Sequence, residues 1–206
     1  MKRFVISIGR QLGCGGKEIA GKLAQRLGIK VYDKTLLEVA ARESGLDTTV
    51  FEQADERESK SFLGNLFSIH GSMSGYFPGS SCIESDKLFE IQSESIRRIA
   101  ERESCIIVGR CAEYVLRDHP GMTSIFITAD HNERIERIMK SEGIEREKAE
   151  SLIEKGDKRR RQYHDYYATT HWGEARCYDL CINASRLGID GSVELLYAFI
   201  KNRFGL

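Results

Sequence analysis

The 206-residue sequence has no long apolar run and no excess of charge of one sign. No segment approaches the roughly 18 consecutive apolar residues of a membrane-spanning helix, and the apolar stretch near the N-terminus is too short for a signal-peptide core. The 31 basic residues balance the 31 acidic residues, so no overall positive field favours non-specific binding to nucleic acid. We therefore expect a cytoplasmic protein that binds neither membranes nor nucleic acid and that takes any polyanion at a local site.

The six cysteines form no metal-binding pattern, because the chain has no C-x-x-C pair and no histidine at zinc-ligand spacing. Without an export signal, we expect reduced thiols, several of them as small core residues on strands. The sequence also contains no internal repeat and no low-complexity tract. With 41% hydrophobic and 30% charged residues, it predicts one packed domain over residues 1–206.

Strands alternate with helices along the chain. The β-rich run Phe4–Ile8 leads through a glycine-rich loop into a segment whose apolar residues recur at helical spacing up to Leu27. Further strands are expected at 29–32, 105–108, 123–128 and 178–183. Further helices are expected at 36–45, 88–103, 131–140, 145–167 and from about 191. This alternation predicts a three-layer α/β/α fold with a central parallel sheet.

The region between residues 46 and 86 has weak periodicity, and its part from 71 to 81 is rich in glycine and serine. Loops of this length are uncommon in compact domains and often act as lids or binding loops, although a plain surface loop fits the same residues. We predict an insertion at 46–86 with a flexible tip.

The glycine loop between the first strand and the first helix carries the first functional signal. The backbone N–H groups of such a loop converge on an anion, and the helix N-terminus adds partial positive charge, so phosphate is the expected ligand. The phosphate-loop pattern G-x-x-x-x-G-K-[ST] is met in part. Gly16 and Lys17 fit its end, whereas Gln11 replaces the first glycine and Glu18 replaces the magnesium-binding hydroxyl. An ordinary glycine-rich turn is the alternative.

Several segments, in order along the chain, resemble the cytidylate kinase-like family, a branch of the phosphate-loop nucleoside monophosphate kinases. The resemblance extends over nearly the whole chain. The segments that carry it are ISIGRQLGCGGKEIA (6–20), VYDK (31–34), VGR (108–110), DKRRR (157–161), YY (166–167), WG (172–173) and YDL (178–180). The resemblance implies transfer of the γ-phosphate of ATP, with Mg²⁺, to a nucleoside monophosphate. It also implies that 46–86 binds the acceptor and that a helical lid lies at 150–170.

The chain departs from this family in the glycine loop. Aligned on Gly13-Cys14-Gly15, cytidylate kinase loops read G-x-G-K-G-T, which places Gly16 in the lysine column and Glu18 in the hydroxyl column. Lys17 is displaced by one residue, and Arg10 is a second candidate for the cation at the β and γ phosphates. The resemblance thus assigns nucleotide binding to Arg10, Gly13, Cys14, Gly15, Gly16, Lys17 and Glu18, with Glu18 as the candidate Mg²⁺ ligand.

The resemblance assigns acceptor binding to Asp33, Gly109 and Arg110. Asp33 follows the second strand, where it could also cap the next helix. Gly109 and Arg110 follow a buried strand at its carboxyl end, where open α/β sheets bind ligands, and Arg110 could clamp a phosphate through two hydrogen bonds. The founding kinases carry aspartates on both sides of this pair, but Val108 and Cys111 stand there, which weakens the indication of cytosine. A surface arginine paired with a glutamate is the alternative for Arg110.

A run of basic residues lies where the resemblance places the lid: Lys155, Lys158, Arg159, Arg160 and Arg161. Such a run is usually a solvated helix face. In monophosphate kinases, however, lid arginines neutralise the charge on the transferring phosphoryl group. The resemblance therefore assigns catalysis to Lys17, Arg160 and Arg161. Arg134 and Arg137 could help to hold ATP or could pair with surface glutamates.

Two other functions remain open from the sequence. A related kinase for another small acceptor fits the weakened cytosine signature, and a nucleotide-binding regulatory protein without catalysis fits Gly16 and Glu18. The sequence determines neither the acceptor nor the oligomeric state.

Overall fold

The computed structural model describes residues 3–33 and 80–206 of the chain. The chain forms two compact units, Met1–Lys34 with Ile96–Leu206, and Thr35–Ser95. The first unit carries the sheet and the glycine loop. The described part of the second unit is the first part of helix α4 (Ser80–Arg102). The predicted helix at 36–45 and residues 46–79 of the predicted insertion lie outside the described residues.

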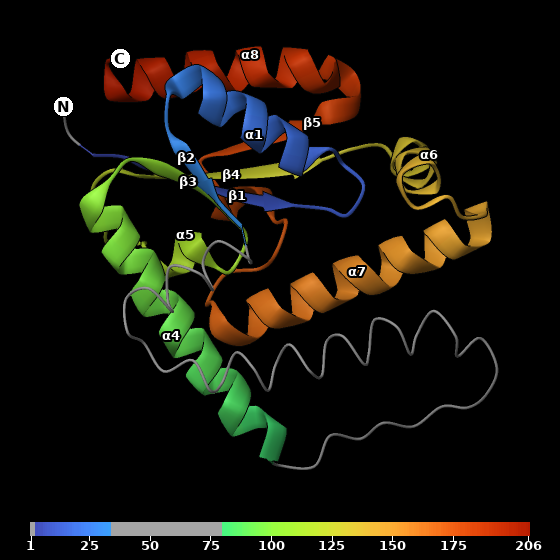
Figure 1. Ribbon diagram of the computed structural model, residues 1–206, viewed down its shortest axis with the longest axis horizontal. Coiled ribbons are helices and arrows are strands. Elements are labelled where there is room, and N and C mark those ends of the chain that lie inside the picture. The colour runs from blue at the N-terminus through green and yellow to red at the C-terminus, as the bar shows by residue number, and fades with distance from the viewer. Residues whose placement is uncertain (1–2, 34–79) are drawn as a thin grey trace. The chain divides into compact units, whose positions relative to one another are not determined.

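The first unit is built around a five-stranded parallel sheet with the order β2-β3-β1-β4-β5 (Figure 1). Its strands are β1 Val5–Arg10, β2 Lys30–Tyr32, β3 Cys105–Val108, β4 Met122–Thr128 and β5 Leu180–Asn183. The central strand β1 pairs in parallel with both β3 and β4. Because parallel strands need crossover connections, the chain must pass over the faces of the sheet between strands, and helices supply these crossings.

Helices cover both faces of the sheet, which confirms the predicted three-layer α/β/α fold (Figure 1). Helices α1 (Gly16–Leu27) and α8 (Ala184–Phe204) lie on one face, and α5 (Ala112–Val115) and α7 (Arg146–Tyr167) lie on the other. Helix α6 (His131–Glu142) precedes α7, and a short 3-10 helix occupies Ala175–Cys177. No helix in the described ranges is long and apolar enough to cross a membrane.

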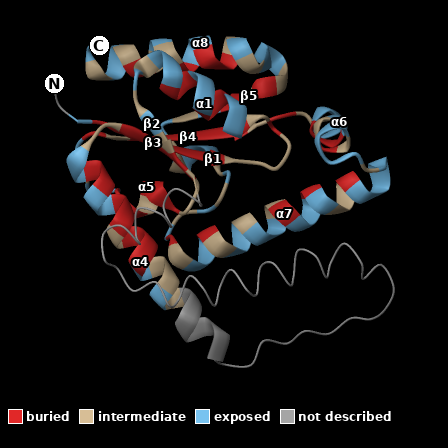
Figure 2. Ribbon diagram, viewed as in Figure 1, coloured by how far each residue is buried: buried red, intermediate tan, exposed pale blue. Residues whose placement is uncertain are grey.

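The main core lies between the sheet and the α1–α8 layer (Figure 2). Ile6 and Ile8 of β1 are fully buried there against Ile19 and Leu23 of α1, because alternate strand residues face the same side of a sheet. Ser7 faces the opposite layer and is also buried. The two faces of β1 therefore have different chemistry, with Ile6 and Ile8 under α1 and, on the other face, the Ser7 hydroxyl bonded to Glu113 of α5.

The observed elements differ from the prediction mainly at their ends. Helix α4 begins at Ser80 instead of 88, and α8 begins at Ala184 instead of 191. The start of α8 is stabilised by Asn183, whose side chain accepts a 3.0 Å hydrogen bond from the Ser185 N–H. Gly188 then interrupts the helix with a non-helical backbone. The early start was missed because the kink breaks the apolar periodicity.

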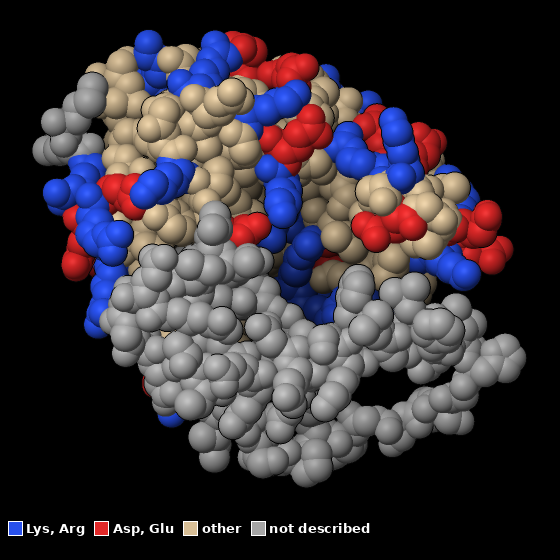
Figure 3. All heavy atoms as spheres, in the orientation of Figure 1, with Lys and Arg blue, Asp and Glu red and all other residues tan. Residues whose placement is uncertain are grey.

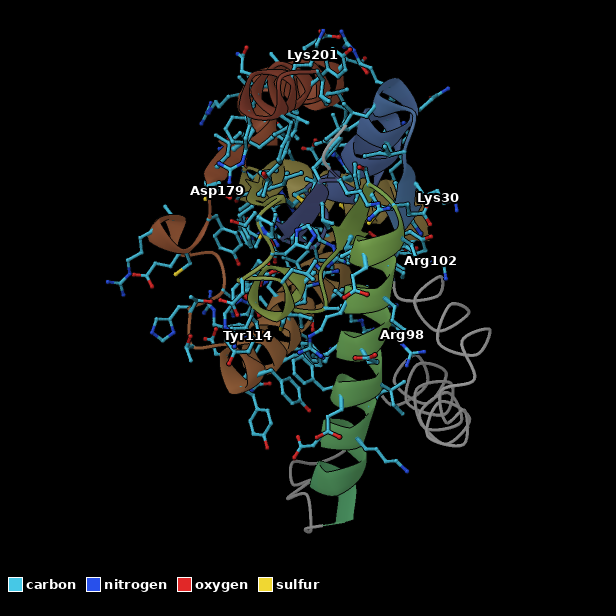
Figure 4. All side chains as sticks on the ribbon, turned by 90° about the vertical axis from the view of Figure 1, so that its left-hand side faces the viewer. Lys30, Arg98, Arg102, Tyr114, Asp179 and Lys201 are labelled. Atoms are coloured by element: carbon cyan, nitrogen blue, oxygen red, sulfur yellow. The ribbon has the colours of Figure 1, made fainter. Side chains whose placement is uncertain are left out.

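The two edge strands are tied to their surroundings by polar contacts. Asp179, directly before β5, accepts a 2.8 Å hydrogen bond from the Ser124 N–H of β4. Figure 4 shows Asp179 at one edge of the sheet and, at the other edge, Lys30 on β2 beside Arg102 at the end of α4. Lys30 forms an ion pair of 3.0 Å with Glu103. These contacts hold the outer strands in register with the centre.

Candidate functional site

The glycine loop runs from the end of β1 to the start of α1. Gly13 and Gly15 have φ angles of 77° and 81°, in the left-handed region that favours glycine. Gly15 is the N-cap of α1, and no side-chain cap satisfies the first turn of this helix. A Cβ atom at Gly13 would lie 2.7 Å from the carbonyl oxygen of Arg134, and one at Gly15 would overlap Nη1 of Arg137. The loop therefore requires glycine for its conformation and for the close approach of α6.

A buried ion pair holds this loop against α6 and α7. Asp157 of α7 accepts a 2.8 Å hydrogen bond from the Leu12 N–H, and Nε of Arg134 donates a 2.7 Å bond to the Leu12 carbonyl. Arg134 and Asp157 also pair with each other, with side chains only 6% and 15% exposed. A Cβ atom at Gly156 would lie 2.7 Å from Leu12, so a glycine on α7 allows this packing. Both backbone groups of Leu12 are thus bonded to charged side chains.

Three arginines gather where β1 and β3 end. Nη1 of Arg160 lies 3.5 Å from the Arg10 carbonyl and 3.6 Å from Asp157. The guanidinium of Arg10 lies against Gly109, directly after β3, next to Arg110. Burial, together with the positive charges of Arg160 and Arg110, lowers the pKa of Arg10 to about 10. In Figure 3, Lys and Arg side chains gather in a recess on the drawn face.

The clustered charge has an electrostatic consequence. Burial also lowers the pKa of Arg160, although the Asp157 carboxylate opposes this shift. Buried cations close to one another are unfavourable unless an anion joins them. The ends of β1 and β3 therefore form a site that is suited to a polyanion such as phosphate.

Arg110 lies in a strained part of the backbone. Gly109, Arg110 and Cys111 have φ angles of 77°, 60° and 53°, and only the first is a glycine. Left-handed backbone costs about 1–2 kcal/mol for a residue with a side chain, and such strain is often found at functional sites. The Arg110 guanidinium lies 5.7 Å from the centre of the Tyr163 ring, which helps to orient it.

The predicted residues Lys17 and Glu18 pair with other side chains, and Asp33 lies close enough to Arg10 for its carboxylate to raise the pKa of that guanidinium. Nζ of Lys17 is 3.3 Å from the Asp33 carboxylate, and the Lys17 side chain is 87% exposed. Oε1 of Glu18 lies 3.3 Å from Nζ of Lys22 on the exposed face of α1. The helix that Asp33 could cap lies outside the described residues. The first turn of α1 thus pairs its charged side chains with the half-buried Asp33 and the exposed Lys22.

The two predicted lid arginines face different surroundings. Arg160 is half-buried next to Asp157, whereas Arg161 is exposed, with its guanidinium 5.8 Å from the centre of the Trp172 ring. Consecutive residues of a helix lie about 100° apart around its axis, so both cannot face one phosphate in this conformation. Arg160 is the one that lies near the glycine loop.

A buried polar network joins the opposite end of α7 to the sheet. Nε2 of His164 lies 2.9 Å from Oε1 of Glu113, and Oε2 of Glu113 accepts a 2.9 Å hydrogen bond from the Ser7 hydroxyl. Nδ1 of His164 lies 3.1 Å from Asp165, which also accepts a 2.9 Å bond from the Trp172 N–H. Although burial opposes its charged form, the Glu113 and Asp165 carboxylates raise the pKa of His164.

Neither this network nor the Leu12 contacts was predicted from the sequence. Asp157 was noted only as part of the DKRRR segment, and Arg134 was considered either a nucleotide contact or a surface residue. Arg134 is instead a buried residue that holds the loop. A polar residue in a buried strand, as at Ser7, was the one available signal that a polar partner lies on that face.

The described residues offer no ready protein site for a metal. No group of three or more His, Cys, Asp or Glu side chains in residues 3–33 and 86–206 could hold one. The carboxylate predicted as the Mg²⁺ ligand, Glu18, is paired with Lys22. Mg²⁺ commonly binds through the phosphates of a ligand and one or two carboxylates, so its binding does not require a site built from protein side chains alone.

These features are those of a phosphate-loop α/β fold: a glycine loop between the first strand and first helix of a parallel sheet, with arginines at the strand ends. The model of the cytidylate kinase-like family matches residues 5–186, and the chain belongs to this family. Membership confirms the resemblance found in the sequence and makes the protein a relative of phosphate-loop kinases, which are phosphotransferases.

Individual relatives agree with this family. A cytidylate kinase from Methanopyrus kandleri is 28% identical over 206 residues, covering 95% of this chain and 92% of its own. The crystal structure of an uncharacterized protein from Eubacterium ventriosum has 30% identity and a TM-score of 0.74, covering 98% of this chain and 100% of its own. Shikimate kinase from Bacteroides thetaiotaomicron has 15% identity and a TM-score of 0.55, covering 96% of this chain and 98% of its own, and shares the fold.

Proposed function

We propose that the protein is a kinase that transfers the γ-phosphate of ATP to a nucleoside monophosphate. The observation that carries this proposal is the convergence of the glycine loop with Arg10, Arg110 and Arg160 at the carboxyl ends of β1 and β3. Phosphoryl transfer depends almost entirely on positioning and charge neutralisation. The backbone N–H groups of the loop supply the positioning, and the three neighbouring arginines supply the positive charge.

The roles divide between donor and acceptor. The backbone N–H groups of residues 13–16 and the N-terminus of α1 hold the donor phosphates, and Arg160 lies over the transferring group. Arg110 and Asp33 place the acceptor. Glu18 and Arg161, which the family resemblance also assigns to the site, would have to turn toward it when nucleotide binds. Mg²⁺ bound to ATP supplies further neutralisation of the phosphate charge.

The choice of acceptor rests on Arg110. A guanidinium at the carboxyl end of a central strand is suited to a phosphate that it can bind through two hydrogen bonds. The cytidylate kinase relative supports a nucleoside monophosphate as the molecule that carries this phosphate. Cytidine and deoxycytidine monophosphates are the first acceptors to test.

A kinase for another small acceptor is the second candidate, and one observation favours it. Val108 and Cys111, which flank Gly109 and Arg110, are both only 3% exposed. Burial also raises the pKa of the Cys111 thiol, which keeps it neutral. The site therefore lacks, at these two positions, the carboxylates with which the founding kinases surround their acceptor.

One experiment separates these functions. ADP production is measured with Mg-ATP and a panel of nucleoside monophosphates, nucleosides and small hydroxy compounds. Turnover with a nucleoside monophosphate supports the proposal, and turnover with a hydroxy compound alone supports the second candidate. Binding of ATP without turnover on any acceptor would identify a nucleotide-binding regulatory protein.

The lid arginines give an internal test of the mechanism. If Arg160 meets the γ-phosphate mainly in the transition state, Arg160→Ala lowers kcat and kcat/KM together, by about a hundredfold, and changes ATP affinity little. Lys155→Ala, which removes an exposed charge from the same helix, is the matched control. Near wild-type turnover of the Arg160→Ala, Arg161→Ala and Arg159→Ala variants alike would contradict the assignment of the lid.

A further inference from the structure

We propose that Arg10 supplies the positive charge that a lysine supplies in phosphate loops of regular sequence, and that Lys17 does not supply it. This inference rests on the proposed function, because it assigns the cation for the donor phosphates of the same site. It concerns the exchange of two residue types between positions 10 and 16.

The exchange is visible in the spacing of the loop. The pattern G-x-x-x-x-G-K-[ST], placed so that its second glycine is Gly15, requires glycine at position 10 and lysine at position 16. The chain has Arg10 and Gly16 at these two positions. The glycine and the cation have therefore changed places, and the residues between them keep their number.

The packing explains why the two changes occur together. A Cβ atom at Gly16 would lie 3.0 Å from Cβ and 3.2 Å from Cγ of Arg10, which is tighter than ordinary contact. Gly16 is the first residue of α1, and its φ angle is not in the left-handed region, so its conformation does not require glycine. The stem of Arg10 fills the space that a side chain at position 16 would need.

A second glycine accommodates the other end of the same side chain. A Cβ atom at Gly109 would overlap Nη1 of Arg10. The Arg10 side chain therefore runs from the start of α1, where the donor phosphates are proposed to bind, to the end of β3, where the acceptor is proposed to bind. A cation in this position reaches the place where a phosphoryl group would pass between them.

The surroundings of Arg10 favour a bound polyanion. Burial and the positive charges of Arg160 and Arg110 lower the pKa of Arg10 to about 10. The Asp33 carboxylate acts in the opposite direction but does not offset them. A phosphate group that bonded to Arg10 would relieve this unfavourable charge.

Lys17 lies in the opposite situation. Its side chain is 87% exposed and its Nζ is already 3.3 Å from the Asp33 carboxylate. An exposed charge in water contributes little to binding, and turning Lys17 inward would break an existing pair. The lysine that follows Gly16 in the sequence is therefore the weaker candidate.

The test compares Arg10→Met, Arg10→Gly, Gly16→Lys, the double variant Arg10→Gly/Gly16→Lys and Lys17→Ala. The matched control is Lys22→Ala, which removes a lysine from the exposed face of the same helix and should leave binding unchanged. Calorimetry measures the affinity of each protein for Mg-ATP and for inorganic tripolyphosphate, and thermal unfolding checks its fold. We expect Arg10→Met, Arg10→Gly and Gly16→Lys each to weaken binding by roughly ten- to a hundredfold. We expect the double variant, which restores the regular pattern, to regain most of the affinity, and Lys17→Ala to bind nearly as the unmutated chain does.

The outcomes separate this inference from the proposed function. If the unmutated chain binds Mg-ATP and tripolyphosphate but Arg10→Met binds them equally well, the inference is wrong and the proposed function stands. A tenfold or larger loss in Lys17→Ala also overturns the inference, whatever the double variant does. If the unmutated chain binds neither ligand, both the inference and the proposed function are wrong.

Discussion

Replacing Asp157 by asparagine tests how strongly α7 holds the glycine loop. The aspartate accepts a hydrogen bond from the Leu12 N–H and pairs with Arg134. Asparagine has nearly the same shape and keeps one oxygen for Leu12, but it removes the negative charge. Arg134 would then remain buried without the carboxylate that neutralises it.

The expected loss follows from how deeply the pair is buried. Breaking a buried ion pair by removing one partner costs about 3–5 kcal/mol, and the retained Leu12 bond places Asp157→Asn near the lower value. At about 2–4 °C per kcal/mol for a chain of this size, a loss of about 3 kcal/mol lowers Tm by roughly 6–12 °C. Asp190→Asn, which removes an exposed partner of Lys22, is the control and should cost less than about 1 kcal/mol.

Urea unfolding followed by circular dichroism measures the free energies of unfolding of Asp157→Asn and Asp190→Asn, and calorimetry measures their Tm values. The double variant Asp157→Asn/Arg134→Met should recover part of the loss, since replacing both members of a buried pair leaves no unpaired charge. Because the pair holds both backbone groups of Leu12, Asp157→Asn should also weaken ATP binding. Equal free energies of unfolding for Asp157→Asn and Asp190→Asn would refute the argument that this pair is a buried constraint on the loop.

Three further predictions concern other parts of the first unit. Folding raises the pKa of His164, so the stability that this histidine contributes is fully present below its unfolded pKa of about 6.5 and is lost as pH rises through its folded pKa. Urea unfolding at several pH values should show this dependence in the unmutated chain and not in His164→Gln. Gly28→Ala meets only the strain of a left-handed φ angle and should lower the free energy of unfolding by about 1 kcal/mol. Gly13→Ala should lower it by about 2–3 kcal/mol more, because the new methyl group also meets the Arg134 backbone. Equal losses of stability in thermal unfolding would contradict this. Mass spectrometry after alkylation should find the exposed Cys181 modified long before Cys105, because burial raises the pKa of the Cys105 thiol to about 12. Early modification of Cys105 would show that its strand opens.

The strands and most helices were predictable because their signals are local. A buried parallel strand such as Cys105–Val108 is a continuous apolar run, and an amphipathic helix such as α1 repeats its apolar residues every three or four positions. The short helix α5 was missed because four residues are too few to show a period. The kink at Gly188 hid the true start of α8 for a similar reason.

Parts of the candidate site were predictable as well. Gly13 and Gly15 mark the loop because glycine is the residue that tolerates a positive φ angle, and Arg110 was expected from its place after a buried strand. Helical spacing predicted that the arginines of the basic run cannot all face one phosphate. The choice of Arg160 over Arg161 was not predictable, because the run does not show which of its members meets a neighbouring element. Nor did the spacing show that Lys17 would pair with Asp33.

The order of residues along the chain determined the class of fold and the position of the phosphate loop, since both depend on periodicity and on backbone conformations that few residue types allow. Only the tertiary structure decided which charges meet. Leu12 and Asp157 are far apart in the sequence, as are Ser7 and Glu113, and each pair contacts only after the sheet has formed. The energy of a buried charge depends on its neighbours in space, so the reasons to prefer Arg10 over Lys17 and the role of Asp157 became visible only when the ends of β1, β3 and α7 were brought together.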